Sequence, residues 1–167
     1  SAADQKEIGR ERGDLKKALA DKLNKNYWEK GFVIPVKGRI SGHFGGQRIM
    51  NGRKMNPHQG TDIAAPEGTP VKAASNGIVR LSGGNYFYSG NTVVIDHGHR
   101  LFTIYAHLKK TSVKPGDYVR QGQVIGEVGK TGRVTGPHLH WGASLNGVRF
   151  TPESLLHMNN ADFCFNL

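Results

Sequence analysis

The sequence predicts a mainly β fold, with one helix near the N-terminus and a short helix near the C-terminus. Glycine is abundant, with 23 copies in 167 residues, and short Val/Ile-rich runs recur between the glycines. This combination favours many short strands joined by tight turns. Residues 1–30 differ, because they are rich in charged side chains and poor in β-branched ones. We therefore expect residues 1–31 to form a helical segment, or the remnant of a longer upstream region, and residues 32–167 to form the main domain.

The N-terminal segment carries one apolar stripe. Large apolar side chains recur there at four-residue spacing: Leu15, Leu19, Leu23 and Tyr27. This spacing is typical of one face of an amphipathic helix. Asp14 is expected to cap the N-terminus of that helix, and Gly31 is expected to end it.

Runs of β-branched residues mark the strands of the main domain. The expected strands are 32–36, 71–74, 77–81, 91–96, 101–107, 123–129 and 138–144, with a further one near 119. The second and third would pair as a hairpin, and the fourth and fifth would do so around Gly98. Thr151 and Pro152 predict the cap and the first position of the C-terminal helix.

The charge and composition restrict the class of protein. The formal net charge is +10, which favours an acidic or polyanionic partner such as peptidoglycan. Nucleic acid is not expected, because the basic residues are scattered and no nucleic-acid module is recognisable. No apolar run approaches the roughly 20 residues of a membrane-spanning helix. The single cysteine, Cys164, excludes an internal disulfide and is interpreted as a small core residue.

Four histidines and one aspartate fall into a pattern that suggests chemistry. His58 and Asp62 are four residues apart, His138 and His140 are two apart, and His107 ends a β-branched run. Residues two or four apart on a strand point to the same face. Two or three imidazoles with one carboxylate and an open position form the ligand set of a catalytic zinc site. The spacing alone leaves open which three residues bind the metal.

The other four histidines have simpler interpretations, since a single histidine on a strand is usually a surface or core residue. His97 and His99 are expected in the turn of the second hairpin, and His157 in the C-terminal helix. His43 is expected near the wall of a groove.

The chain resembles the lysostaphin-like metallopeptidases of family M23 in several stretches. The first is 58–71, which begins His58-Gln-Gly-Thr-Asp62, and the others are 105–108, 136–141 and the intervening 113–126. The resemblance runs from about residue 38 to residue 155, in the order of the family. It implies that His58, Asp62 and His140 bind zinc, one ion per chain, while His107 and His138 stay off the metal and take part in catalysis.

The resemblance also implies a fold and an activity. The family fold is a largely antiparallel β-sheet with a groove over the metal site. Its members hydrolyse peptide cross-links of peptidoglycan outside the cytoplasmic membrane, with a zinc-bound water attacking the scissile carbonyl. The likeness is greater to members from Gram-negative bacteria, which implies cleavage of D-alanyl–meso-diaminopimelate rather than of a glycine bridge. We therefore expect an exported monomer of the periplasm or cell envelope.

Two loops are candidates for contacting the substrate. The loop 47–57 is polar and basic, and the loop 85–90 is aromatic. Their candidate substrate-binding residues are Arg48, Asn51, Arg53, Tyr86 and Tyr88, with Lys54 as a further cation. The simpler interpretation is a solvated loop for the first and core packing for the second.

Two other functions are compatible with parts of the sequence. Residues 113–126 are also similar to lipoyl and biotinyl carrier domains, but the chain has no carrier-lysine tripeptide and that reading leaves the histidine pairs unexplained. The second alternative is a latent or non-catalytic peptidoglycan-binding activator of other wall hydrolases. The complete set of five site residues argues against it, although the N-terminal segment leaves a latent form open.

Overall fold

The computed structural model describes residues 1–158, so Cys164 lies outside the described residues. In chain order the elements are α1 (Ala2–Ala18), β1 (Arg39–Gly42), β2 (Ile49–Met50), β3 (Arg53–Lys54), β4 (Thr61–Ala64), β5 (Pro70–Lys72), β6 (Gly77–Tyr86), β7 (Gly90–Asp96), β8 (Leu101–Thr111), β9 (Tyr118–Val119), β10 (Val124–Val128), β11 (His138–Leu145), β12 (Val148–Phe150) and the 3-10 helix η1 (Pro152–His157).

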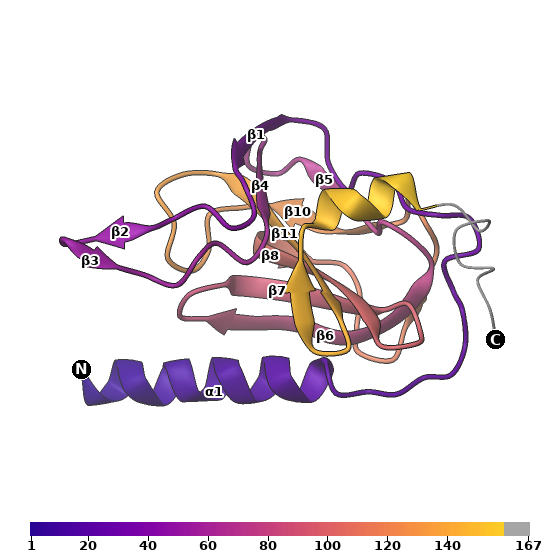
Figure 1. Ribbon diagram of the computed structural model, residues 1–167, viewed down its shortest axis with the longest axis horizontal. Coiled ribbons are helices and arrows are strands. Elements are labelled where there is room, and N and C mark those ends of the chain that lie inside the picture. The colour runs from indigo at the N-terminus through magenta and orange to yellow at the C-terminus, as the bar shows by residue number, and fades with distance from the viewer. Residues whose placement is uncertain (159–167) are drawn as a thin grey trace.

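Ten of the strands form one sheet, and β2 and β3 form a separate hairpin (Figure 1). The main path of the sheet is β1-β4-β11-β8-β7-β6-β9, with β5, β10 and β12 attached beside it. All of its pairings are antiparallel. The mainly β prediction is therefore confirmed, as are the hairpin around Gly98, formed by β7 and β8, and the short helix that starts at Pro152 after its cap Thr151.

Two of the predictions about strands are wrong: one predicted pairing and one predicted strand. β5 does not pair with β6; it pairs with β10, while β6 pairs with β7 and β9. Ala73, just after β5, exchanges backbone hydrogen bonds with Gln123 and Gly122, and this directs the chain towards β10. Residues 32–36 are not a strand, since they make only isolated bonds to the 72–74 segment and Pro35 has no N–H to donate.

The N-terminal helix exists, but it lies earlier in the chain than the apolar spacing predicts. It starts after Ser1, whose side chain accepts from the Asp4 N–H while Asp4 bonds back to the Ser1 amino group. It ends at Ala18, so Asp14 lies inside the helix and Gly31 lies well beyond it. Beyond Ala18 the backbone bonds instead to the 97–99 turn, and this keeps residues 23–27 out of the helix.

The two faces of the sheet bury different clusters. On the inner face, Ile63, Tyr105, Leu139 and Trp141 belong to the main core, together with Trp28, Phe32 and Val36 from the segment that precedes β1. On the outer face, Val94, Phe102 and Ile104 pack against Ala18 of α1, with Leu15 and Leu19 beside them. Figure 1 shows α1 running alongside β6. Within the described residues, no helix is long and apolar enough to cross a bilayer.

The site residues share the outer face with α1. His140 lies opposite Ala106, and Gly142 lies opposite Ile104, in the β11–β8 register. Directly paired residues of an antiparallel sheet point to the same face. His140 therefore projects from the face that α1 covers farther along the sheet.

Candidate active site

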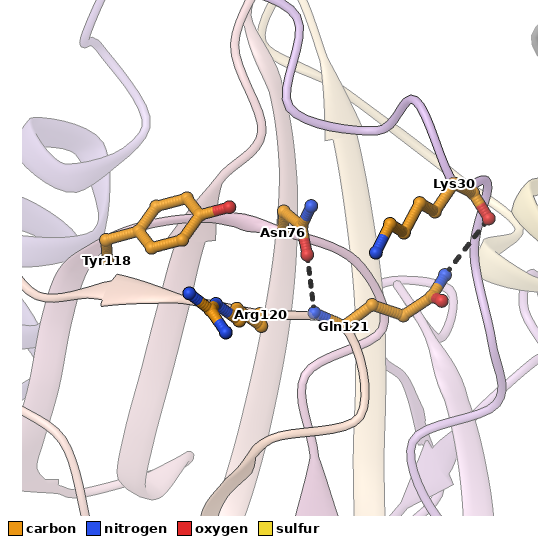
Figure 2. Close-up of a pocket in the computed structure, with 5 residues that line it drawn as sticks. All are labelled: Lys30, Asn76, Tyr118, Arg120 and Gln121. Carbon is orange, nitrogen blue, oxygen red and sulfur yellow. Dashed lines mark hydrogen bonds between the residues drawn. The ribbon is translucent and has the colours of Figure 1, made fainter.

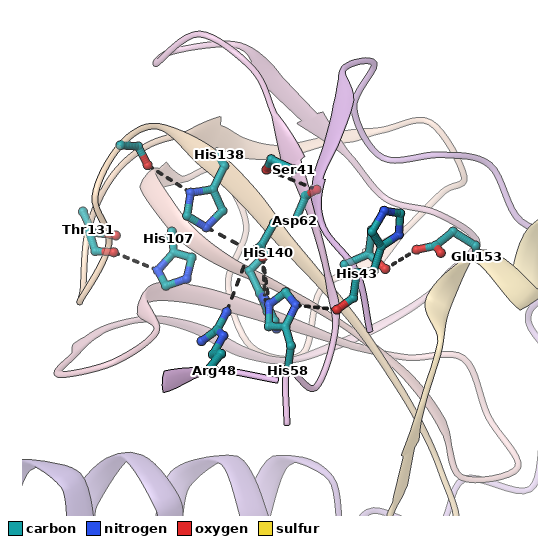
Figure 3. A network of polar contacts seen from close by, with 12 residues as sticks. Ser41, His43, Arg48, His58, Asp62, His107, Thr131, His138, His140 and Glu153 are labelled. Carbon is teal, nitrogen blue, oxygen red and sulfur yellow. Dashed lines mark hydrogen bonds and ion pairs between the residues drawn. The ribbon is translucent and has the colours of Figure 1, made fainter. Parts of the chain in front are cut away.

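The sheet brings the predicted ligands together from two neighbouring strands. His140 on β11 is the direct partner of Asp62 on β4, and His138 is the partner of Ala64. Alternation buries Leu139 and Ile63 on the inner face and leaves both histidines and Asp62 on the outer one. His58 precedes β4 and is brought in by backbone bonds between the 43–46 turn and residue 58. Figure 3 shows these side chains converging.

Three potential ligand atoms form a compact triangle. His58 Nε2 lies 3.1 Å from Asp62 Oδ1. His140 Nδ1 lies 2.9 Å from the same oxygen and 3.2 Å from His58 Nε2. Zinc–nitrogen bonds of about 2.0–2.1 Å in a tetrahedron place neighbouring ligand atoms about 3.3 Å apart. The triangle is therefore close to the size that one zinc ion requires.

The protonation of His58 supports the same conclusion. Its Nδ1 lies 3.0 Å from the His43 carbonyl oxygen, which only accepts, so Nδ1 carries the proton. In the neutral ring, Nε2 then presents a lone pair towards the Asp62 carboxylate, which also has only lone pairs. A cation between the two atoms satisfies both of them. His43 thus serves the site through its backbone carbonyl, which holds the His58 ring.

Gly60 makes room for the cluster. A Cβ at this position would lie 2.6 Å from the Trp141 carbonyl oxygen and 2.7 Å from the His140 ring. The His140 ring therefore fits against the segment between His58 and Asp62 only because residue 60 has no side chain. The glycine in the His-Gln-Gly-Thr-Asp stretch has a steric role at the candidate metal site.

His107 reaches the site because β8 is irregular there. Tyr105 is in the inner core, so a regular strand would direct His107 to the inner face as well. The β7–β8 register instead shifts between Asn91 and Val93, and His107 has a φ of 63°. A bulge of this kind redirects a side chain. The His107 ring consequently lies 4.9 Å, centroid to centroid, from His138 and 6.0 Å from His140.

Two backbone carbonyls orient the remaining histidines. His107 Nδ1 donates to the Thr131 carbonyl, at 2.9 Å, and His138 Nδ1 donates to the Gly136 carbonyl, also at 2.9 Å. Each ring therefore keeps Nε2 as the atom with a free lone pair. Thr131 and Gly136 were not among the predicted site residues. Gly136 begins the family-like stretch 136–141, whereas Thr131 is marked only by the glycine-rich composition of the 129–136 loop.

The surroundings of the cluster favour an ionised carboxylate beside neutral imidazole rings. Burial would raise the pKa of Asp62, but without a metal ion the protonated imidazoles of His140 and His58 would donate hydrogen bonds to this carboxylate, and their charges hold its pKa well below the usual value. Burial lowers the pKa of His107 to about 4, with a smaller contribution from the positive charge of His140. Burial also lowers the pKa of His140. Neutral imidazoles and an ionised carboxylate are the forms that bind a divalent metal.

The basic loop lies beside this cluster. Arg48 Nη2 is 3.7 Å from Asp62 Oδ2, although more than half of the Arg48 side chain is exposed. Asn51 occupies the turn of the β2–β3 hairpin with a φ of 50°. Asn51 and Arg53, with Met50, Met55 and Arg133, line an open hollow of about 430 Å³. Arg133 was not predicted; it belongs to the same 129–136 loop as Thr131.

The aromatic loop is divided between two environments. Tyr86 is 4% exposed, and its hydroxyl donates to Asp14 of α1. It therefore packs against the helix and is not open to a substrate in this structure. Tyr88 is 39% exposed, with its ring against Phe87. Its carbonyl accepts from the Arg133 N–H, which links it to the loop beside the site.

The histidines outside the cluster have structural surroundings. His97 is fully buried in the turn after β7, where Nδ1 bonds the Asn76 carbonyl and Nε2 bonds Thr103 Oγ1. His157 lies in η1. A second hollow, of about 230 Å³, lies near Asn76 and Gln121 and contains none of the site residues (Figure 2). The Gln121 backbone N–H donates to Asn76 Oδ1, and Gln121 Nε2 donates to the carbonyls of Lys30 and Gly31, which explains this feature as structural.

Known proteins resemble the chain in both sequence and structure. Peptidoglycan DD-endopeptidase ShyC of Vibrio cholerae is 38% identical over 148 residues, covering 83% of this chain and 34% of the relative. The chain thus spans about a third of that protein. A putative M23 peptidase from Pseudomonas aeruginosa superposes with a TM-score of 0.79 at 38% identity, over 90% of this chain and 61% of that one.

A zinc-containing peptidase from Vibrio cholerae superposes with a TM-score of 0.68 at 38% identity, over 73% of this chain and 39% of that one. The profile of peptidase family M23 matches residues 56–152. That range is more than half of the chain, and it includes all three members of the ligand triangle and both neighbouring histidines. On this evidence the chain belongs to peptidase family M23.

Proposed function

We propose that the chain is a zinc-dependent endopeptidase that hydrolyses the peptide cross-links of peptidoglycan. The observation that carries the proposal is the triangle of His58 Nε2, Asp62 Oδ1 and His140 Nδ1, with edges of 2.9–3.2 Å. The name of ShyC supports the choice of peptidoglycan. We propose one zinc ion per chain, a monomer, and action in the periplasm or cell envelope, where that polymer is found.

The roles of the side chains follow from their tautomers. A zinc ion held by His58, Asp62 and His140 would polarise the scissile carbonyl and make the attacking water more acidic. His107 remains neutral at neutral pH because its pKa is lowered to about 4, so its Nε2 is free to take a proton from that water. His107 then passes that proton to the leaving amine, while His138, after taking a proton from solvent at Nε2, donates a hydrogen bond to the oxygen that becomes negative.

The basic side chains support a diaminopimelate substrate. A glycine bridge has no charge along its length, whereas a diaminopimelate cross-link has a free carboxylate beside the scissile bond. Arg48 already reaches a carboxylate oxygen of the site, and Arg53 lines the neighbouring hollow together with Arg133. Arginine binds carboxylates with two parallel hydrogen bonds, so this side of the site suits the D-alanyl–meso-diaminopimelate bond.

The test uses two substrates. The purified chain is incubated with sacculi of the diaminopimelate type and, separately, with pentaglycine peptides, and the products are identified by mass spectrometry. We expect cross-linked muropeptide dimers to disappear with a matching rise in monomers, and pentaglycine to stay intact. Cleavage of pentaglycine alone would reject the proposed bond, whereas no cleavage of either substrate would favour the non-catalytic alternative.

A further inference from the structure

A buried carboxylate of α1 bonds to a turn next to the site. Glu11 is 5% exposed. Its Oε2 accepts from the Tyr88 N–H at 2.9 Å, and its Oε1 accepts from the Ser89 N–H at 3.0 Å. Buried carboxylates are costly unless they are hydrogen-bonded, and bonds from N–H groups to a charged acceptor are among the stronger ones. Glu11 therefore fixes the turn between β6 and β7.

The same turn holds the backbone of His107. The carbonyl of Ser89 accepts the His107 N–H at 2.8 Å, at the bulge where His107 adopts its φ of 63°. Ser89 thus bonds Glu11 through its N–H and His107 through its carbonyl. The next residues add a second connection, because the Asn91 N–H donates to Thr131 Oγ1 and the Thr131 carbonyl accepts from the His107 ring.

We propose that Glu11 is a positioning residue for His107, so that α1 forms part of the support of the catalytic site. The inference rests on the proposed function, in which His107 transfers a proton. The bulge alone does not fix His107, since a left-handed backbone at a non-glycine residue persists only when its surroundings hold it there. The bonds from Glu11 through Ser89 supply that restraint.

The helix α1 also contacts the sheet through residues other than Glu11. A substitution at Glu11 can therefore be tested while α1 stays packed on the sheet. Leu15, Ala18 and Leu19 pack against the outer-face cluster of Phe102 and Ile104. Asp14 accepts the hydroxyl of Tyr86. The substitution Glu11→Gln keeps the size of the side chain but replaces one acceptor oxygen by a donor NH₂ group, which cannot bond a backbone N–H.

The experiment compares Glu11→Gln with two controls on the same helix. Asp14→Asn removes a neighbouring charge that does not bond residues 88–89, and Ile8→Ala removes a buried apolar contact of α1. For each zinc-loaded protein, kcat and KM are measured on a soluble cross-linked muropeptide dimer, with zinc content and amide hydrogen exchange at His107. We expect Glu11→Gln to lower kcat about tenfold or more with KM and zinc unchanged, because small misplacements of a catalytic group have effects of this size. The His107 amide should exchange faster in that variant only.

Three outcomes would overturn the inference. They are an unchanged kcat, an unchanged exchange rate at the His107 amide, and an equal loss of kcat in Ile8→Ala, which would indicate a general loosening of α1. The exchange measurement does not depend on turnover. If the unmodified chain cleaved no dimer, the proposed function would fail, while faster exchange at His107 in Glu11→Gln alone would still support the structural link.

Discussion

The strand pair β4–β11 and the hairpin β2–β3 border the same site but are built in opposite ways. On β4 and β11, alternate residues are fully buried, including Ile63, Leu139 and Trp141. Every residue of β2 and β3 is exposed, and the hairpin pairs only with itself. The proposed metal ligands Asp62 and His140 thus belong to the firmly packed pair. Under the proposed function, the core therefore holds the groups that carry out the chemistry, whereas the candidate substrate-binding residues Asn51 and Arg53 lie on an exposed hairpin, as binding residues often do.

The strongest test of the packed pair is His140→Ala. We expect this variant to lose its zinc and to lose activity by about 10⁴-fold or more, because a metal supplies several kcal/mol of transition-state stabilisation. Elemental analysis and dimer cleavage measure the two losses. His157→Ala, in η1, is the control and should keep both properties. Full zinc content in His140→Ala would show that the ligand triangle is assigned wrongly.

Removing either uncoordinated histidine should have the next largest effect. His107→Ala and His138→Ala should keep zinc and lose activity by about 10²–10⁴-fold, which is the usual contribution of a general acid or base. The measurement is kcat on the muropeptide dimer, with zinc content determined on the same samples. If either variant lost its metal as readily as His58→Ala does, the separation between ligands and proton-transfer groups would not stand.

The exposed hairpin should show a smaller effect that depends on the substrate. Arg48→Ala and Arg53→Ala should each raise KM about tenfold or more, as expected for loss of a charge-assisted hydrogen bond. The comparison uses a second cross-linked substrate that is identical except that an amide replaces the free diaminopimelate carboxylate. Wild type and variants should bind that amidated substrate almost equally.

The control for this prediction is Lys16→Ala, which removes one positive charge from the last turn of α1. If it weakened binding as much as Arg48→Ala, the arginines would act only through general attraction to an anionic wall. That result would contradict a specific contact with the carboxylate.

Regular, packed strands are the part of the site that the sequence predicts well. Alternation predicts that His138 and His140 share a face, because both lie on one regular, packed strand. The approach of His107 depends on a bulge with a left-handed backbone, and the motif Tyr105-Ala-His107 gives no sign of it. Family resemblance supplied the role of His107, whereas the spacing did not. The partners of the histidine rings are backbone carbonyls, at His43, Thr131 and Gly136, and a carbonyl has no residue type to recognise.

The helix shows a different limit of prediction. The stripe from Leu15 to Tyr27 has helical spacing, yet the helix ends at Ala18. Beyond that point the backbone of Leu23 and Tyr27 bonds the 97–99 turn, a long-range pairing that local periodicity does not contain. Tertiary hydrogen bonds here override the local preference.

The smallest predicted effect concerns the pH dependence of the packed core, through the buried His97. Its ring lies in a chain of hydrogen bonds in which Thr103 joins it to the Tyr105 hydroxyl, and burial lowers its pKa to about 4. The folded protein therefore keeps this ring neutral, while the unfolded chain binds a proton below about pH 6.5. Its contribution to stability is complete above pH 6.5 and is lost as the pH falls towards 4.

Between pH 7.5 and 5.5 this difference lowers the free energy of unfolding by about 1 kcal/mol. The substitution His97→Gln retains one donor and one acceptor but does not titrate, so its stability should fall by about 1 kcal/mol less over the same range. Urea unfolding of both metal-free proteins at the two pH values measures the difference, and the other histidines cancel because both proteins contain them. Equal pH dependence in the two proteins would mean that His97 is protonated in the fold, and the neutral hydrogen-bond chain through Thr103 and Tyr105 would then be wrong.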